Sequence, residues 1–122
     1  DSAINLSREQ FLTFSKPYDG PLLSEYGGWI HFCGRAHQWW ECLLDILGLK
    51  AINPYQGEFY DVIDMYSKCE AAGIPIVQWT QPLGAPARER IRTGFSRTLT
   101  VGSFEDACGA RDTLHSTGHA DF

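Results

Sequence analysis

The stretch WIHFCGRAHQWWECLLDILGLKAIN, residues 29–53, contains the pattern that decides the fold. Its first five residues alternate, which predicts a strand with His31 and Cys33 on one face and two apolar side chains on the other. Apolar side chains within residues 36–47 recur at spacings of three and four, which predicts a helix. Residues 50–53 then predict a short buried strand. A strand, a helix and a second strand in this order predict a βαβ unit.

The same alternation continues on both sides of this unit. Ser7 and Gln10 have the spacing of a capping box, so Ser7 is expected to open the first helix. The further predicted elements are a break at Pro17, a turn at residues 19–21, a short helix at 22–26, a helix at 58–72, a strand at 74–80, a helical turn at 87–92, a strand at 95–101, a helix capped by Ser103 and a patternless tail at 116–122. The sequence therefore predicts one α/β domain over residues 1–122, with mainly parallel strands.

Composition excludes several classes of function. The chain has 122 residues and a net charge of -5 without a basic stripe, so we expect no nucleic-acid partner. Its apolar runs are far too short to span a bilayer, so we expect no membrane association. No secretory signal pattern opens the sequence, and the four cysteines are therefore expected to be reduced thiols of a cytoplasmic protein.

The segment LSREQFLTFSKPYDGPLLSEYGGWIHFCG, residues 6–34, resembles the uroporphyrinogen decarboxylase superfamily. In that family a Ser-x-x-x-Phe helix, a Pro-Tyr pair and a strand ending in His-x-Cys-Gly follow one another. Here these features are Ser7 with Phe11, then Pro17-Tyr18, then residues 31–34. The resemblance covers roughly residues 1–80. It implies the C-terminal half of a TIM-type (β/α)8 barrel, in which residues 1–5, 29–33, 51–53 and 74–80 would belong to strands five to eight.

This resemblance also implies that the first four strands of the barrel are absent from the chain. We therefore expect a part of a longer enzyme that is inactive alone. Half a barrel has open sheet edges and an uncovered apolar face, both of which favour association. The chain is thus expected to form a homo-oligomer through its exposed edges, and a clean monomer in light scattering at high concentration would contradict this.

His31 and Cys33 are the main candidates for chemistry. Residues two apart on a strand have Cα atoms about 6.5–7 Å apart on one face, so an imidazole and a thiolate could reach one metal ion. The superfamily includes cobamide-dependent methyltransferases, in which a His-x-Cys pair and a later cysteine hold zinc that activates a thiol such as coenzyme M. By that resemblance His31 and Cys33 are the first two zinc ligands. Cys108 stands at a suitable distance in sequence for the third, although its segment predicts a helix. The alternative is a core histidine beside an inert thiol.

Other polar residues are expected near the ends of strands, where barrel enzymes bind their small-molecule substrates. They are Asp1, Arg35, His37, Asn53 and Gln78. Two other functions stay open. One is a porphyrinogen decarboxylase-like lyase, which in this superfamily needs no metal and binds acidic substrates through arginines from the first strand. The other is a non-catalytic binding or assembly module.

Overall fold

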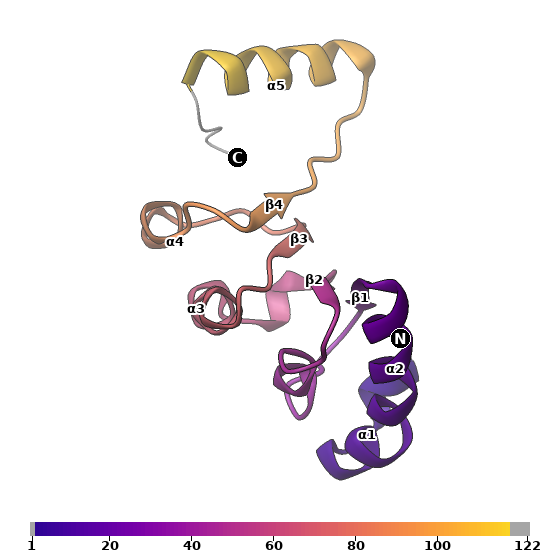
Figure 1. Cartoon of the computed structure of the whole chain (residues 1–122). Helices are drawn as coiled ribbons and strands as arrows, with labels where there is room; N and C mark the ends of the chain where they lie inside the picture. Colours follow the sequence, from indigo (N-terminus) through magenta and orange to yellow (C-terminus); the bar gives the residue numbers. More distant parts are fainter. Residues whose placement is uncertain (1, 118–122) are drawn as a thin grey trace.

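The computed structural model describes residues 2–117, apart from the side chains of Leu114 and Thr117. Its centre is an all-parallel sheet of four strands in the order β1-β2-β3-β4 (Figure 1). The strands are β1 (Gly28–Phe32), β2 (Leu49–Pro54), β3 (Ile76–Trp79) and β4 (Phe95–Arg97). The predicted α/β class with parallel strands is therefore confirmed, and the strands are connected by helical segments throughout.

The helical segments precede, separate and follow these strands. The α-helices are α1 (Arg8–Phe14), α2 (Lys16–Tyr26), α3 (Val62–Ala72), α4 (Ala85–Arg90) and α5 (Phe104–Thr117), and the 3-10 turns are η1 (Ser2–Asn5), η2 (Trp40–Leu43) and η3 (Gly57–Phe59). Ser7 caps α1 with the predicted capping box, in which both reciprocal hydrogen bonds to Gln10 are present. Within residues 2–117, no helix is long and apolar enough to cross a membrane.

The core lies on one face of the sheet. Parallel pairing places Ile30, Ile52, Ile76 and Phe95 side by side across the four strands, and the two middle side chains are fully buried. Helical side chains cover this row, and α3 and α4 lie on the same side of the sheet in Figure 1. In β1, Trp29 and His31 point to the opposite face of the sheet from Ile30. Both are exposed, as the period of two predicts.

Three predicted elements are wrong in kind. Residues 2–5, which were expected to belong to strand five of a barrel, form the 3-10 turn η1. Residues 36–47 form turns and the short η2 instead of an α-helix. The physical reason is tertiary: the Gln38 amide donates to the carbonyls of Ile4 and Leu6, and the Trp39 indole donates to the carbonyl of Ala3. These bonds, together with the burial of Trp39, override the helical spacing of the segment.

The predicted turn at residues 19–21 is also wrong, because these residues lie inside α2. Pro17 stands in the first turn of that helix, where its missing N–H leaves no bond unmade. The Ser15 hydroxyl donates to the Asp19 carboxylate over 2.8 Å at the same end. The proline that breaks the first helix thus begins the second one directly, and Pro21 is carried within it.

Candidate functional site

The site begins with two side chains at the carboxyl end of β1. His31 projects from the exposed face of the strand, and the half-buried Cys33 follows one residue after the strand ends. The Cys33 Sγ lies 3.2 Å from the His31 Nε2, within hydrogen-bonding distance for sulfur. The predicted pairing of the two side chains is therefore present.

Asn53 on the neighbouring strand completes a chain of contacts. The parallel register places it directly beside His31, and its Oδ1 lies 2.6 Å from the His31 Nδ1. Its Nδ2 donates to the Val77 carbonyl on β3 over 2.8 Å. Asn53 is only 3% exposed, and these two bonds hold its side chain beside His31. That it also binds substrate stays a prediction.

The Val77 carbonyl lies within an irregular part of β3. The pairing of β3 with β4 shifts between Ile76 and Trp79, and within this shift Gln78 has φ 57°, in the left-handed region. A residue with a β-carbon seldom adopts this conformation, and such bulges occur often beside functional sites. The Gln78 N–H donates to the Ser96 hydroxyl of β4, which holds the bulge from the other side.

The turn after Cys33 is closed by a residue that the sequence analysis missed. The Tyr60 hydroxyl donates to the Gly34 carbonyl and accepts from the Ala36 N–H, each over 2.7 Å. Burial raises the pKa of Tyr60. Gly34 has φ 74°, a left-handed conformation that favours glycine, and a Cβ there would stand 2.8 Å from the Ile4 Cδ1. A tyrosine in the first turn of the helix predicted at residues 58–72 carries no signal for this long-range bond.

Two of the other predicted substrate residues, Arg35 and His37, contact aromatic rings. The Arg35 guanidinium stands 4.9 Å above the Phe59 ring, and the His37 ring stacks on Tyr60 at 4.7 Å; both side chains are exposed. Gln78 is exposed at the bulge. Asp1 lies outside the described residues. Arg35 and His37, which follow the carboxyl end of β1, thus present polar groups to solvent.

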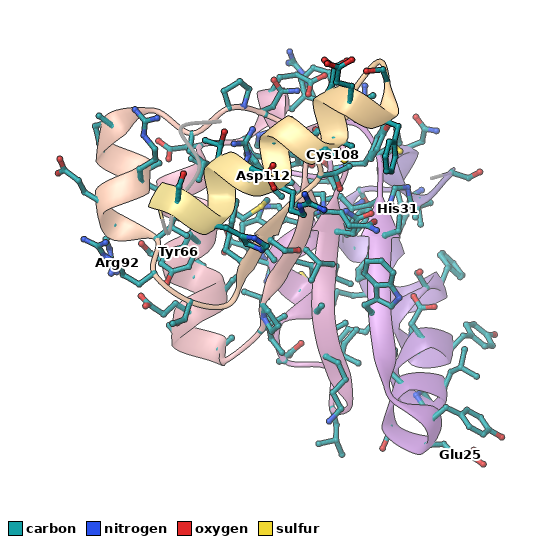
Figure 2. The ribbon with its side chains drawn as sticks, turned by 90° about the horizontal axis from the view of Figure 1, so that it is seen from above. Glu25, His31, Tyr66, Arg92, Cys108 and Asp112 are labelled. Carbon is teal, nitrogen blue, oxygen red and sulfur yellow. The ribbon has the colours of Figure 1, made fainter. Side chains whose placement is uncertain are left out.

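Cys108 does not join the pair. It lies on α5, as the sequence predicted, and Figure 1 places that helix beyond β4, at the opposite end of the sheet order from β1. Figure 2 labels His31 and Cys108 on these separate elements. Within the described part of the chain, no group of three or more His, Cys, Asp or Glu side chains is arranged to hold a metal ion. The predicted third zinc ligand is therefore not assembled among these residues.

The pair itself fits two positions of a zinc site. Zinc bonds of about 2.3 Å to sulfur and about 2.0 Å to nitrogen at a tetrahedral angle place the two atoms about 3.5 Å apart. The observed 3.2 Å is close to this separation. Asn53 supplies the outer hydrogen bond that zinc-bound histidines ordinarily make through their other nitrogen.

A cavity of about 220 Å³ opens beside His31. Its walls are mostly apolar and come from β1, η2 and the segments around α1, with Ser15 and Asp19 as the other polar members. An apolar hollow with a few polar groups is the usual form of a small-molecule site, although such sites are commonly larger, at about 300–1,000 Å³.

The remaining cysteines are unlike Cys33. All four cysteines are reduced thiols, as predicted. Cys42 and Cys69 are buried in the core, and burial raises the pKa of the Cys69 thiol to about 12. A thiol in this environment stays protonated and packs as an apolar group. Cys33 is thus the half-exposed cysteine that has a histidine nitrogen beside it.

Comparison with known proteins does not identify a family for the chain. No protein-family model, curated protein or solved structure matches it. Functional inference therefore depends on the sequence motif and on the geometry around His31.

Proposed function

We propose that this chain is the C-terminal portion of a (β/α)8-barrel enzyme of the uroporphyrinogen decarboxylase superfamily, from the methyltransferase-like branch. The observation that carries the proposal is the contact of 3.2 Å between Cys33 and His31 at the carboxyl end of β1. Catalytic groups of β/α barrels come from this end of the strands. The small-molecule substrate would bind there in the intact enzyme.

The order of the strands supports a barrel over the other common parallel fold. In a β/α barrel each strand pairs with the next one along the chain, whereas a doubly wound sheet reverses its order at a switch point. The order β1-β2-β3-β4 contains no such reversal. By residue range β1, β2 and β3 overlap the expected strands six, seven and eight, whereas residues 2–5 form η1 and β4 lies beyond the expected strand eight.

The proposed chemistry is methyl transfer to a thiol. Cys33 Sγ and His31 Nε2 would hold zinc, which when bound would favour the thiolate form of a thiol substrate. The protein's own part is to fix the two ligand atoms: Asn53 holds the imidazole from below, and Tyr60 with Gly34 holds the turn that carries Cys33. Structural zinc sites need four protein ligands and catalytic ones about three. Zinc uptake by this chain therefore requires a third side chain to join the pair when the metal binds. Even with zinc bound, we expect the chain to be inactive without the rest of the barrel.

The test is zinc binding by the purified chain. Metal analysis after dialysis against zinc should find one zinc per chain in the wild type and a loss of that zinc in Cys33→Ser. Cys42→Ser is the matched control, because Cys42 is a buried thiol in η2 and should leave binding unchanged. A wild-type chain that takes up no zinc would remove the support for methyl transfer.

Cys108 needs its own variant, because the resemblance makes it the third ligand. If Cys108→Ser also loses zinc, α5 must move to the pair when metal binds. If Cys108→Ser binds zinc like the wild type, the third ligand lies elsewhere in the enzyme, and the assignment of Cys108 is wrong.

Association through the sheet edges belongs to the same proposal. Both β1 and β4 are edge strands, and Trp29 on the uncovered face of β1 is 51% exposed. Half of a barrel would need a second copy to cover these surfaces. Light scattering across a range of concentrations should show a dimer or a larger species, and a monomer at every concentration would contradict this expectation.

A further inference from the structure

We infer that Asn53 is a positioning residue that fixes which nitrogen of His31 carries the proton, so that Nε2 is the nitrogen offered toward Cys33. The part of the inference that concerns zinc binding rests on the proposed function. The His31 tautomer itself can be measured on the metal-free chain. The contacts that carry it run from β3 through Asn53 on β2 to His31 on β1.

The first step is the orientation of the Asn53 side chain. Its two ends differ chemically, since the amide nitrogen only donates hydrogen bonds and the oxygen only accepts them. The Val77 carbonyl, 2.8 Å away, can only accept. The Nδ2 end of Asn53 must therefore face Val77, and a reversed amide would place two acceptors against each other in a buried place.

The second step follows for the histidine. With Nδ2 turned to Val77, the Asn53 Oδ1 is the atom that faces His31 Nδ1, at 2.6 Å. An oxygen that only accepts requires a donor opposite, so Nδ1 must carry a hydrogen. In the neutral imidazole the other nitrogen, Nε2, then has the free electron pair. This nitrogen is the one 3.2 Å from Cys33 Sγ.

The third step concerns the cost of the arrangement. Neutral imidazole in water prefers the hydrogen on Nε2, so the protein must impose the other tautomer. Asn53 is 3% exposed, so water does not replace either of its bonds easily. The left-handed backbone at Gln78 turns the Val77 carbonyl to its place, and strain of this kind is maintained only where surrounding structure holds it. A backbone carbonyl two strands away thus selects the metal-binding nitrogen.

The experiment is two-bond ¹H–¹⁵N NMR of the metal-free chain in mildly alkaline buffer, where imidazole is neutral. The His31 signals are identified from their loss in His31→Gln. In the wild type we expect a protonated Nδ1 and an unprotonated Nε2. In Asn53→Leu, which has a similar volume and no polar atoms, we expect a shift toward the Nε2-protonated form. His37, which is exposed and stacked on Tyr60, is the internal control and should not change.

Gln78 provides variants that spare the asparagine, should Asn53→Leu fail to fold. Gln78→Gly keeps a residue suited to φ 57° and should leave the His31 tautomer unchanged. Gln78→Val places a β-branched side chain where it is disfavoured, and it should shift part of the His31 population. Circular dichroism establishes that each variant is folded before its tautomer is read.

Zinc titration adds the functional measurement. Loss of an outer hydrogen-bond partner typically weakens metal binding about 10- to 100-fold. We expect this loss in Asn53→Leu and no loss in Gln78→Gly. A wild-type His31 protonated on Nε2, or an Asn53→Leu variant with an unchanged tautomer, would overturn the inference. If the tautomer shifts as expected but the wild type binds no zinc, the inference stands and the proposed function fails.

Discussion

Residues 2–79 and residues 81–117 of the same chain are built in contrasting ways. Every buried member of the hydrophobic core cluster lies in the first region, between Phe11 and Trp79. In the second region α5 has no buried side chain among those described, and Phe104 at its start is 85% exposed. Both regions carry helices with caps and apolar residues. The contrast shows that a helix can carry a cap and apolar residues without burying them, whereas most of the stability of a helix comes from packing against the rest of the protein.

Removal of Trp79 should have the largest effect on stability. This side chain is 2% exposed, packs against Phe95 and fills the space over Gly57, where any Cβ would stand 2.8 Å from its ring. Trp79→Ala should therefore lower the free energy of unfolding by about 3–5 kcal/mol, measured in urea. A loss below about 1 kcal/mol would mean that the end of β3 is not part of the cooperative core.

The next largest loss of stability should come from raising the pH, because it acts on Cys69, a buried thiol within residues 2–79. Burial raises the pKa of Cys69 to about 12, above its ordinary value of about 9.0. The folded state thus holds this proton more tightly than the unfolded chain. The resulting stability is complete below about pH 9 and is lost as the pH rises toward 12. Burial shifts the pKa of Tyr60 in the same direction.

Urea midpoints between about pH 8 and pH 11 check this expectation. Cys69→Ala should fall less steeply with pH than the wild type. Cys108→Ala is the matched control, because Cys108 lies on α5 outside the core, and its slope should equal that of the wild type. Equal slopes for all three proteins would contradict the assignment to Cys69.

The two serine caps provide a smaller and more direct comparison. The Ser7 hydroxyl accepts from the Gln10 N–H at the start of α1, and the Ser103 hydroxyl accepts from the Asp106 N–H at the start of α5. Ser7→Ala should cost about 1 kcal/mol of global stability, because α1 contributes Phe11 to the core. Ser103→Ala should leave the urea midpoint unchanged and increase amide hydrogen exchange within α5 alone. Equal global losses would show that α5 belongs to the cooperative unit.

The smallest effect is expected at Phe104. The side chain is large, but with 85% of it exposed little apolar area leaves the solvent on folding. Phe104→Ala should change the free energy of unfolding by no more than about 0.5 kcal/mol in urea. A larger loss at high protein concentration than at low concentration would show instead that Phe104 is covered by a second copy.

Much of the fold was predictable because local rules apply to it. The capping box at Ser7, the strands around His31 and Asn53, and the C-terminal glycine of α3 at Gly73 all follow from short-range patterns. Residues 36–47 were mispredicted because their helical spacing competes with hydrogen bonds to the segment before α1. Spacing within a segment contains no information about a partner thirty residues away.

The candidate site divides in the same way. The spacing of His31 and Cys33 predicted their proximity, because alternate strand residues share a face. Asn53 was expected near the same edge but in contact with substrate, and its bonds to His31 and Val77 appear only when the parallel register is known. No pattern in the sequence predicted that the Tyr60 hydroxyl bonds to the turn after β1.

The sequence by itself determined that this is an α/β protein with parallel strands and a histidine beside a thiol, because those features arise from periodicity over a few residues. Only the tertiary structure decided how the histidine is held, through Asn53 and the bulged carbonyl of Val77, and that Cys108 stands apart from it. The physical reason is that strand register, backbone bulges and side-chain hydrogen bonds between strands are set by packing among distant segments.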